Sequence, residues 1–167
     1  MAELTTTERL QPSLLDRLTD AAPSQREESR EQRVISATRL RECVIRDLSW
    51  LLNAVNLETS RPLEAHPQVR SSVLNYGIPD LAGVAVSGID ATALQQRIRQ
   101  AILAFKPRLI PETLRVSVHA DAARMDRRSL LFTIESEMWA QPLPLNLYLK
   151  TALDLETGRL DVVEGNG

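Results

Sequence analysis

The spacing of apolar residues changes along the chain from about 3.6 to about two residues per repeat, and the change falls near Pro111. Before it, apolar residues recur at helical spacing, as at Leu94, Ile98 and Ile102. After it, they alternate with polar residues, as in a strand that buries one face. Helices followed by half-buried strands predict an α+β fold, with N-terminal helices and a small, mostly antiparallel sheet.

Two segments before Pro111 have the pattern of amphipathic helices, with a shorter one between them. The first has one apolar face made by Leu40, Val44, Leu48, Leu51, Leu52 and Val55. The second follows Asp90, a suitable N-cap, and stops before Pro107. Its apolar face holds Leu94, Ile98, Ala101, Ile102 and Phe105, and Ile89 can pack on Leu94 across the cap. Between the two, we expect Pro67 to open a helix through Val69, Val73 and Leu74 that Gly77 and Pro79 end.

Four strands are predicted after Pro111, at 113–119, 129–138, 145–153 and 159–164. Each alternates apolar and polar residues, which is typical of a strand with one buried face. The sequence Glu156-Thr157-Gly158 predicts a hairpin turn into the last strand.

The first 33 residues are predicted to form a mobile arm attached to a single domain at 34–167. A short amphipathic helix is expected between Pro12 and Asp20, where Leu14, Leu15 and Leu18 share a face. Residues 24–33 are almost free of apolar side chains, which favours a mobile link.

Composition excludes several classes of protein. The net charge of −2 and the pI of about 5.8 provide no basic field for nucleic acid. No apolar run reaches the roughly 18–20 residues of a membrane span, and the N-terminal residues do not resemble a signal peptide, so we expect a cytoplasmic protein. The single cysteine, Cys43, excludes an intrachain disulfide and is expected to be a core thiol. His66 and His119 match no metal-ligand spacing, and no cofactor or metal is expected.

One pair of carboxylates has a spacing that hydrolases use. Glu135 and Glu137 share a strand face at a Cα separation of roughly 6.5–7 Å, and two carboxylates about 6.5–9.5 Å apart can hydrolyse glycosides. Acids that alternate with apolar residues are also the ordinary solvated face of a strand. We favour that interpretation and expect no catalytic residue.

Charge is distributed unevenly, which suits docking between proteins. Residues 91–128 contain eight basic and three acidic side chains, whereas 129–167 contain two basic and six acidic ones. The basic stretch Arg124–Arg128 is predicted to be a polar hairpin tip that an acidic partner could bind.

Three stretches, at Leu40–Asn53, His66–Gly83 and Phe105–Leu109, resemble the TssE family of type VI secretion baseplate wedge proteins. That family is related to the small wedge protein of contractile phage tails and carries the description lysozyme-like. The resemblance covers about residues 10–165. The structural motif that it carries over comprises Asn75, Tyr76, Gly77, Pro79, Asp80, Pro107 and Arg108. Lys106 stands where the family usually has a glutamate, so the resemblance does not carry over that residue's ion pair.

The resemblance implies a structural protein without enzymatic activity. Its members sit in the cytoplasmic baseplate beside TssF and TssG, with TssK completing each of six wedges. Their fold is similar to the strand-exchange domain of the sheath proteins TssB and TssC, which implies that the chain templates the first sheath layer. We expect the pairing strand to be the last one, with residues Leu160, Asp161, Val162, Val163 and Glu164. Neither nucleic acid nor direct membrane insertion is expected. The alternative is a peptidoglycan-cleaving hydrolase that uses Glu135 and Glu137.

Overall fold

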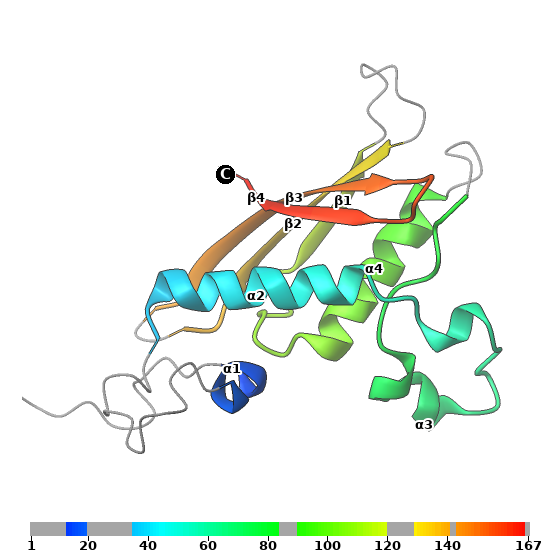
Figure 1. The fold of residues 1–167 in the computed structure, drawn as a ribbon, viewed down its shortest axis with the longest axis horizontal. Coiled ribbons are helices and arrows are strands. Elements are labelled where there is room, and N and C mark those ends of the chain that lie inside the picture. Colours follow the sequence, from blue (N-terminus) through cyan, green and yellow to red (C-terminus); the bar gives the residue numbers. More distant parts are fainter. Residues whose placement is uncertain (1–12, 20–34, 84–89, 120–128, 141–142, 166–167) are drawn as a thin grey trace, which may run out of the picture.

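The computed structural model describes residues 13–19, 35–83, 90–119, 129–140 and 143–165. In these ranges, helices pack against one face of an antiparallel sheet, as Figure 1 shows. The α-helices are α1 (Leu14–Leu18), α2 (Ala37–Leu52), α3 (Pro67–Arg70) and α4 (Ala91–Phe105). Two 3-10 turns, η2 (Leu57–Thr59) and η3 (Val73–Asn75), flank α3, and the strands are β1 (Arg115–His119), β2 (Ser129–Met138), β3 (Leu145–Asp154) and β4 (Leu160–Glu164). The predicted α+β fold is confirmed.

The sheet is a meander in the order β1-β2-β3-β4, with every neighbouring pair antiparallel. The four strands lie within two residues of the predicted positions. Gly158 has a φ of +70° in the turn between β3 and β4, a conformation that glycine adopts without steric cost. The two edges of the sheet are therefore β1 and β4.

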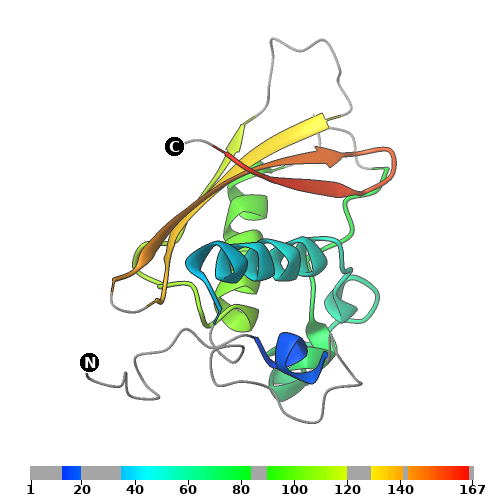
Figure 2. The ribbon, with the colours of Figure 1, turned by 60° about the vertical axis from the view of Figure 1, so that its left-hand side comes forward.

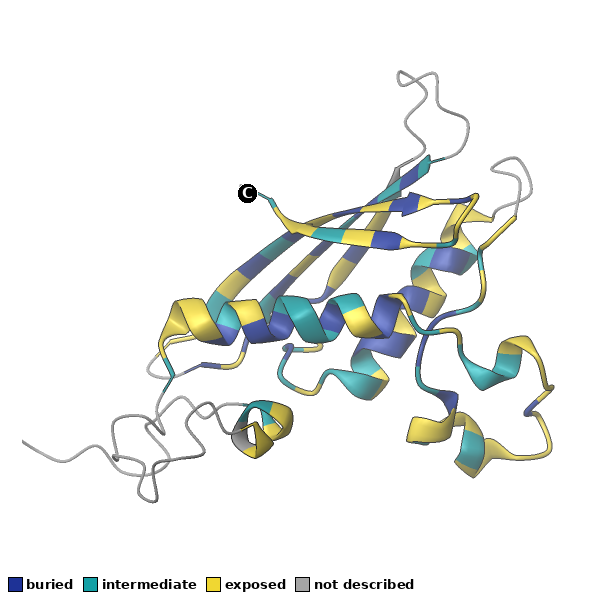
Figure 3. Ribbon diagram, in the orientation of Figure 1, coloured by how far each residue is buried: buried dark blue, intermediate teal, exposed yellow. Residues whose placement is uncertain are grey.

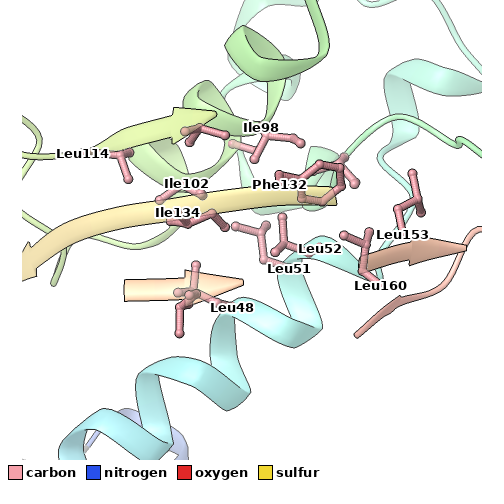
Figure 4. Close-up of a cluster of buried hydrophobic side chains, with 14 of the residues drawn as sticks. Leu48, Leu51, Leu52, Ile98, Ile102, Leu114, Phe132, Ile134, Leu153 and Leu160 are labelled. Carbon is pink, nitrogen blue, oxygen red and sulfur yellow. The ribbon is translucent and has the colours of Figure 1, made fainter. Parts of the chain in front are cut away.

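The core lies between the sheet and the two long helices (Figures 2 and 4). The predicted helix faces are buried there, because α2 packs beside β4 and α4 packs beside β1. Fully buried side chains from α2, α4, β2 and β3 belong to this core: Leu48, Leu51, Leu52, Ile98, Ile102, Phe132, Ile134 and Leu149. Along β2 and β3, buried residues alternate with partly buried or exposed ones (Figure 3), so the outer face of the sheet is left uncovered by helices.

Capping side chains begin both long helices. Ser36 accepts a hydrogen bond from the backbone N–H of Arg39, and Asp90 accepts from those of Thr92 and Ala93. Helix α4 ends at Phe105, two residues before Pro107, as predicted. Ile89, expected to pack across the cap, lies outside the described residues.

Two helical predictions are wrong in part. The helix expected through Val69, Val73 and Leu74 is split into α3 and η3, because the Ser72 hydroxyl caps η3 by accepting from the Leu74 N–H. Val73 and Leu74 are exposed rather than packed. Val55 is not on a helix: α2 ends at Leu52, and Val55 forms a parallel bridge with Ile78 while 57% of its surface stays exposed.

The predicted N-terminal helix exists as α1, but its three leucines are exposed. Its Asp16 side chain forms an ion pair with Arg46 of α2. The polar link at 24–33 and the basic stretch at 124–128 lie outside the described residues, as does the side chain of His119. The division into an arm and a domain at residue 34 stays a prediction.

Candidate functional site

Asn75 holds together the loop at 71–80, which carries most of the predicted structural motif and is called the motif loop below. Its buried side chain accepts a hydrogen bond from the Glu58 N–H at 3.0 Å and donates one to the Arg70 carbonyl at 3.1 Å. One side-chain amide therefore satisfies a backbone N–H of η2 and a backbone carbonyl of α3. Both elements are too short to supply these partners from their own backbone.

Gly77 lets the same loop pass close to the end of α2. Its φ is +124°, and a Cβ there would lie 2.2 Å from the carbonyl oxygen of Ala54. The next residue, Ile78, exchanges backbone hydrogen bonds with Ala54 and Asn56 at 2.9 and 3.0 Å. Only glycine combines this conformation with this close approach.

Tyr76 joins the motif loop to the end of α4. Its ring meets that of Phe105 edge to face, with centroids 5.2 Å apart. Its hydroxyl accepts a hydrogen bond from Lys106 Nζ at 3.2 Å. Burial lowers the pKa of Lys106 and raises that of Tyr76, since both charged forms lose water there. The structure thus brings together two stretches that are separate in the sequence.

A groove of about 700 Å³ lies between this loop and α4. Asn75, Gly77, Pro79 and Asp80 of the motif line one side, with Asn56, Glu58, Thr59 and Arg70 near them. Helix α4 supplies Arg97, Gln100, Ala101, Ala104 and Phe105. Glu58 and Arg70 form an ion pair at 3.1 Å. The small alanines on α4 leave room for a side chain or a backbone segment of another protein.

Pro107 and Arg108 lie where α4 gives way to the sheet. The Arg108 carbonyl accepts from the Trp139 N–H at 2.8 Å, and the neighbouring Leu109 is buried and bridges to Met138. The Arg108 side chain is half-buried. Trp139 and Leu143 are exposed beside this junction at the end of the β2–β3 hairpin.

Side chains from α2 and its C-cap contact β4 near both of its ends. Because Asp154 N–H donates to the Arg159 carbonyl, and hydrogen-bonded pairs alternate along the ladder, the backbone groups of Leu160, Val162 and Glu164 point away from β3. The Asn53 side chain accepts from Leu160 N–H and donates to its carbonyl, both at 2.9 Å.

Arg41 acts at the other end of the same edge. It donates to the Asn146 carbonyl at 3.0 Å and forms an ion pair with Glu164 at 3.2 Å. Val162 lies between these two contacts, and its N–H and carbonyl have no hydrogen-bond partner among the described residues. The predicted pairing strand is therefore an edge strand, and the outward backbone groups that a side chain binds are those of Leu160.

The β1 edge of the sheet also has outward-pointing backbone groups next to one that a helix side chain binds. The odd-numbered residues of β2 face β1, as the bond from Ile110 N–H to the Glu137 carbonyl shows. The outward groups of β1 therefore belong to Val116 and Val118, and just before them Arg99 donates to the Leu114 carbonyl at 3.4 Å.

Glu135 and Glu137 lie on the outer face of the sheet, as the solvated interpretation predicts. Glu135 is exposed and sits between Arg115 and Tyr148, while Glu137 is opposite Asn146. Neither lines the groove. Cys43 is buried, as predicted. Within the described ranges, no three His, Cys, Asp or Glu side chains gather to hold a metal ion.

Sequence reasoning missed Asn53, Arg41 and Arg99. Asn53 and Leu160 are 107 positions apart, and no local pattern marks an asparagine that will cap a distant strand. The groove was missed for the same reason, because η2 and α4 meet only in the folded chain.

None of the described helices has the length and apolar character needed to cross a membrane. Comparisons with curated proteins and with solved structures found no match. A comparison with protein families matched residues 38–143 to the family described as baseplate wedge protein gp25, the family of TssE. This match spans more than half of the chain and includes the motif loop, the groove and the Pro107–Arg108 junction. The chain belongs to the baseplate wedge protein gp25 family.

Proposed function

We propose that this chain is a structural component of a type VI secretion baseplate that joins TssF and TssG and templates the first layer of the TssB/TssC sheath. Membership of the wedge family supports the first role. The observation that carries the second is the open middle of β4, where the Val162 N–H and carbonyl point outward at a sheet edge. Unpaired backbone groups at such an edge can bind a strand from another chain.

The wedge partners bind the side of the molecule where the stretches at 66–83 and 105–109 meet. Three features lie in or next to the stretches at 66–83 and 105–109: the groove, the Tyr76–Lys106 contact and the exposed Trp139. They supply a concave surface, a positive charge and an exposed apolar side chain, respectively. Exposed aromatic and arginine side chains are frequent anchors in protein interfaces. TssF and TssG occupy this side, TssK completes the wedge, and six wedges form the cytoplasmic baseplate.

The protein works without catalysis. Glu135 and Glu137 lie on the uncovered sheet face and line no part of the groove, so they have no enclosed site in which to act on a sugar. A hydrolase needs its carboxylates on opposite sides of a bound glycosidic bond. No observation favours the hydrolase alternative.

Co-purification with TssF and TssG from the same bacterium tests the proposed assembly. We expect the wild-type chain to recover both proteins, and Ala104→Glu to lose them because it places a larger charged side chain in the groove. Gln96→Glu is the matched control, since Gln96 is exposed on α4 but does not line the groove. Failure of the wild-type chain to recover either protein would refute the proposal.

A further inference from the structure

Arg46 is held in a fixed orientation by its neighbours on α2. Its Nε and one terminal nitrogen donate to Asp47 Oδ1 at 3.1 and 2.9 Å. Its guanidinium lies over the Trp50 ring, 5.1 Å from the centroid. An arginine held in this way presents its remaining N–H groups as a fork that matches a carboxylate.

The fork is occupied by Asp16 of α1. Two guanidinium nitrogens donate to the two carboxylate oxygens, at 2.6 and 3.1 Å. The thiol of Cys43 lies beside the same carboxylate. The hydrogen bond from Arg46 holds the pKa of Asp16 well below its usual range, while burial raises that of the Cys43 thiol. The site is therefore complementary to an ionised carboxylate.

Helix α1 contributes little else to its own attachment. Leu14, Leu15 and Leu18 are 69%, 42% and 73% exposed, so the apolar face that could anchor α1 is turned outward. Among the described side chains of α1, only Asp16 forms a polar contact with the rest of the protein. The polar attachment of α1 therefore rests on one two-pronged ion pair, and because both side chains are partly open to solvent the pair weakens as salt is added.

We infer that Arg46, framed by Asp47, Trp50 and Cys43, is a carboxylate receptor on α2, and that Asp16 is a resident occupant that an acidic segment of a partner protein displaces. The orienting groups all belong to α2, so the receptor persists when α1 leaves. The incoming ligand is an aspartate or glutamate side chain, because the fork requires two oxygens in one plane. Displacement frees α1 together with its exposed leucine face.

Alkylation of Cys43 in the full-length chain measures the release of α1. Cys43 is the only cysteine, it is 3% exposed, and its thiol lies against Asp16. Arg46→Gln should raise the labelling rate about tenfold, since it replaces a charge-assisted pair with a neutral contact. It also removes a cation that lowers the pKa of the thiol, so faster labelling reports release of α1 and not a more reactive thiol. Glu42→Gln is the matched control: it removes the exposed Arg39–Glu42 ion pair from the same helix and should leave the rate unchanged.

Binding in trans tests the receptor itself. A synthetic peptide of residues 12–19 with an amidated C-terminus, whose only carboxylate is that of Asp16, should bind the full-length Asp16→Asn chain at millimolar concentration, detected by NMR shifts of α2 amides. The same peptide with asparagine in place of Asp16 should not bind, and neither peptide should bind the Asp16→Asn/Arg46→Gln double variant.

The wild-type chain should bind the peptide about tenfold more weakly, because its own Asp16 competes at a high effective concentration. Equal binding of the two peptides, no binding of either, or equal Cys43 labelling in wild type and Arg46→Gln would overturn the inference. Melting temperatures of the variants within the range set by Glu42→Gln confirm that the comparison is between folded proteins.

Discussion

The ammonium group of Lys106 donates a hydrogen bond to the hydroxyl of Tyr76 at 3.2 Å and lies 5.4 Å from the centre of its ring. This contact connects the motif loop to the end of α4. A basic side chain therefore occupies this junction here, and it is partly buried with Tyr76. The groove begins beside it, at Phe105.

The partly buried Lys106 should make the free energy of unfolding depend on pH in alkaline solution. Because burial lowers its pKa in the folded state, the unfolded chain binds more protons between that lowered value and 10.5. Lys106 therefore makes a contribution to the free energy of unfolding that rises with pH below 10.5, whereas the raised pKa values of Tyr76 and Cys43 make contributions that fall in alkaline solution. The slope of the free energy of unfolding against pH, measured by chemical denaturation, should therefore be lower in Lys106→Met than in wild type. Lys150→Met, which replaces the other lysine at an exposed position, should follow wild type. Identical slopes in all three proteins would contradict this.

Substitution of Gly77 should be far more costly than that of Gly83. Both have positive φ, but a Cβ at Gly77 would clash with the Ala54 carbonyl, whereas one at Gly83 would meet open space. Gly83→Ala should cost about 1 kcal/mol of folding free energy, and Gly77→Ala about 3 kcal/mol or more because steric overlap is added to strain. Urea denaturation of both variants measures the difference, and equal costs would show that the close approach at Gly77 is not a constraint.

Neutralising Glu135 or Glu137 should leave secretion intact. Both acids face outward on the sheet, so Glu135→Gln and Glu137→Gln remove charge without opening a cavity. Secretion of a known effector by cells with each variant is the measurement. Muramidase turnover by the purified wild-type chain that either substitution abolishes would establish the hydrolase instead.

Arg108 should be structural. It follows Pro107 at the junction between α4 and the sheet, and its half-buried guanidinium can satisfy acceptors there. Arg108→Ala should lower the melting temperature or the recovery of TssF and TssG, and the loss reaches several kcal/mol if the guanidinium pairs with a buried charge. Arg97→Ala, an exposed arginine that lines the groove, separates the two effects because it should leave the melting temperature unchanged. An Arg108→Ala protein with wild-type melting and wild-type recovery would refute this role.

Much of the fold was predictable because it follows from residues close together in the sequence. The alternation through Leu130, Phe132 and Ile134 predicts β2, and Asp90 with Pro107 brackets α4. The hairpin turn predicted at 156–158 makes β3 and β4 neighbours. Segments governed by distant contacts were not predictable: Val55 leaves the helix to pair with Ile78, and the leucines of α1 are exposed because Asp16 makes the contact.

The candidate site was predicted only in its parts. Tyr76 and Lys106 are 30 positions apart in the sequence. Their hydrogen bond forms only when α4 and the motif loop pack together, so no local pattern predicts it. The edge position of β4 was expected, but its partial closure by Asn53 and Arg41 was not, because side chain to backbone bonds across the fold leave no periodic signal.

The most direct test of the account is to image fluorescent sheath in cells whose only copy of this chain carries Val162→Pro. The Val162 N–H points away from β3, so proline removes an outward donor without removing a bond of the sheet. Val118→Pro is the matched variant at the β1 edge, where the N–H also points outward. We expect the Val162→Pro protein to fold and to bind TssF and TssG, but sheath should fail to polymerise in the correct place. Val118→Pro cells should form normal sheaths. Normal numbers of full-length sheaths in Val162→Pro cells would contradict it.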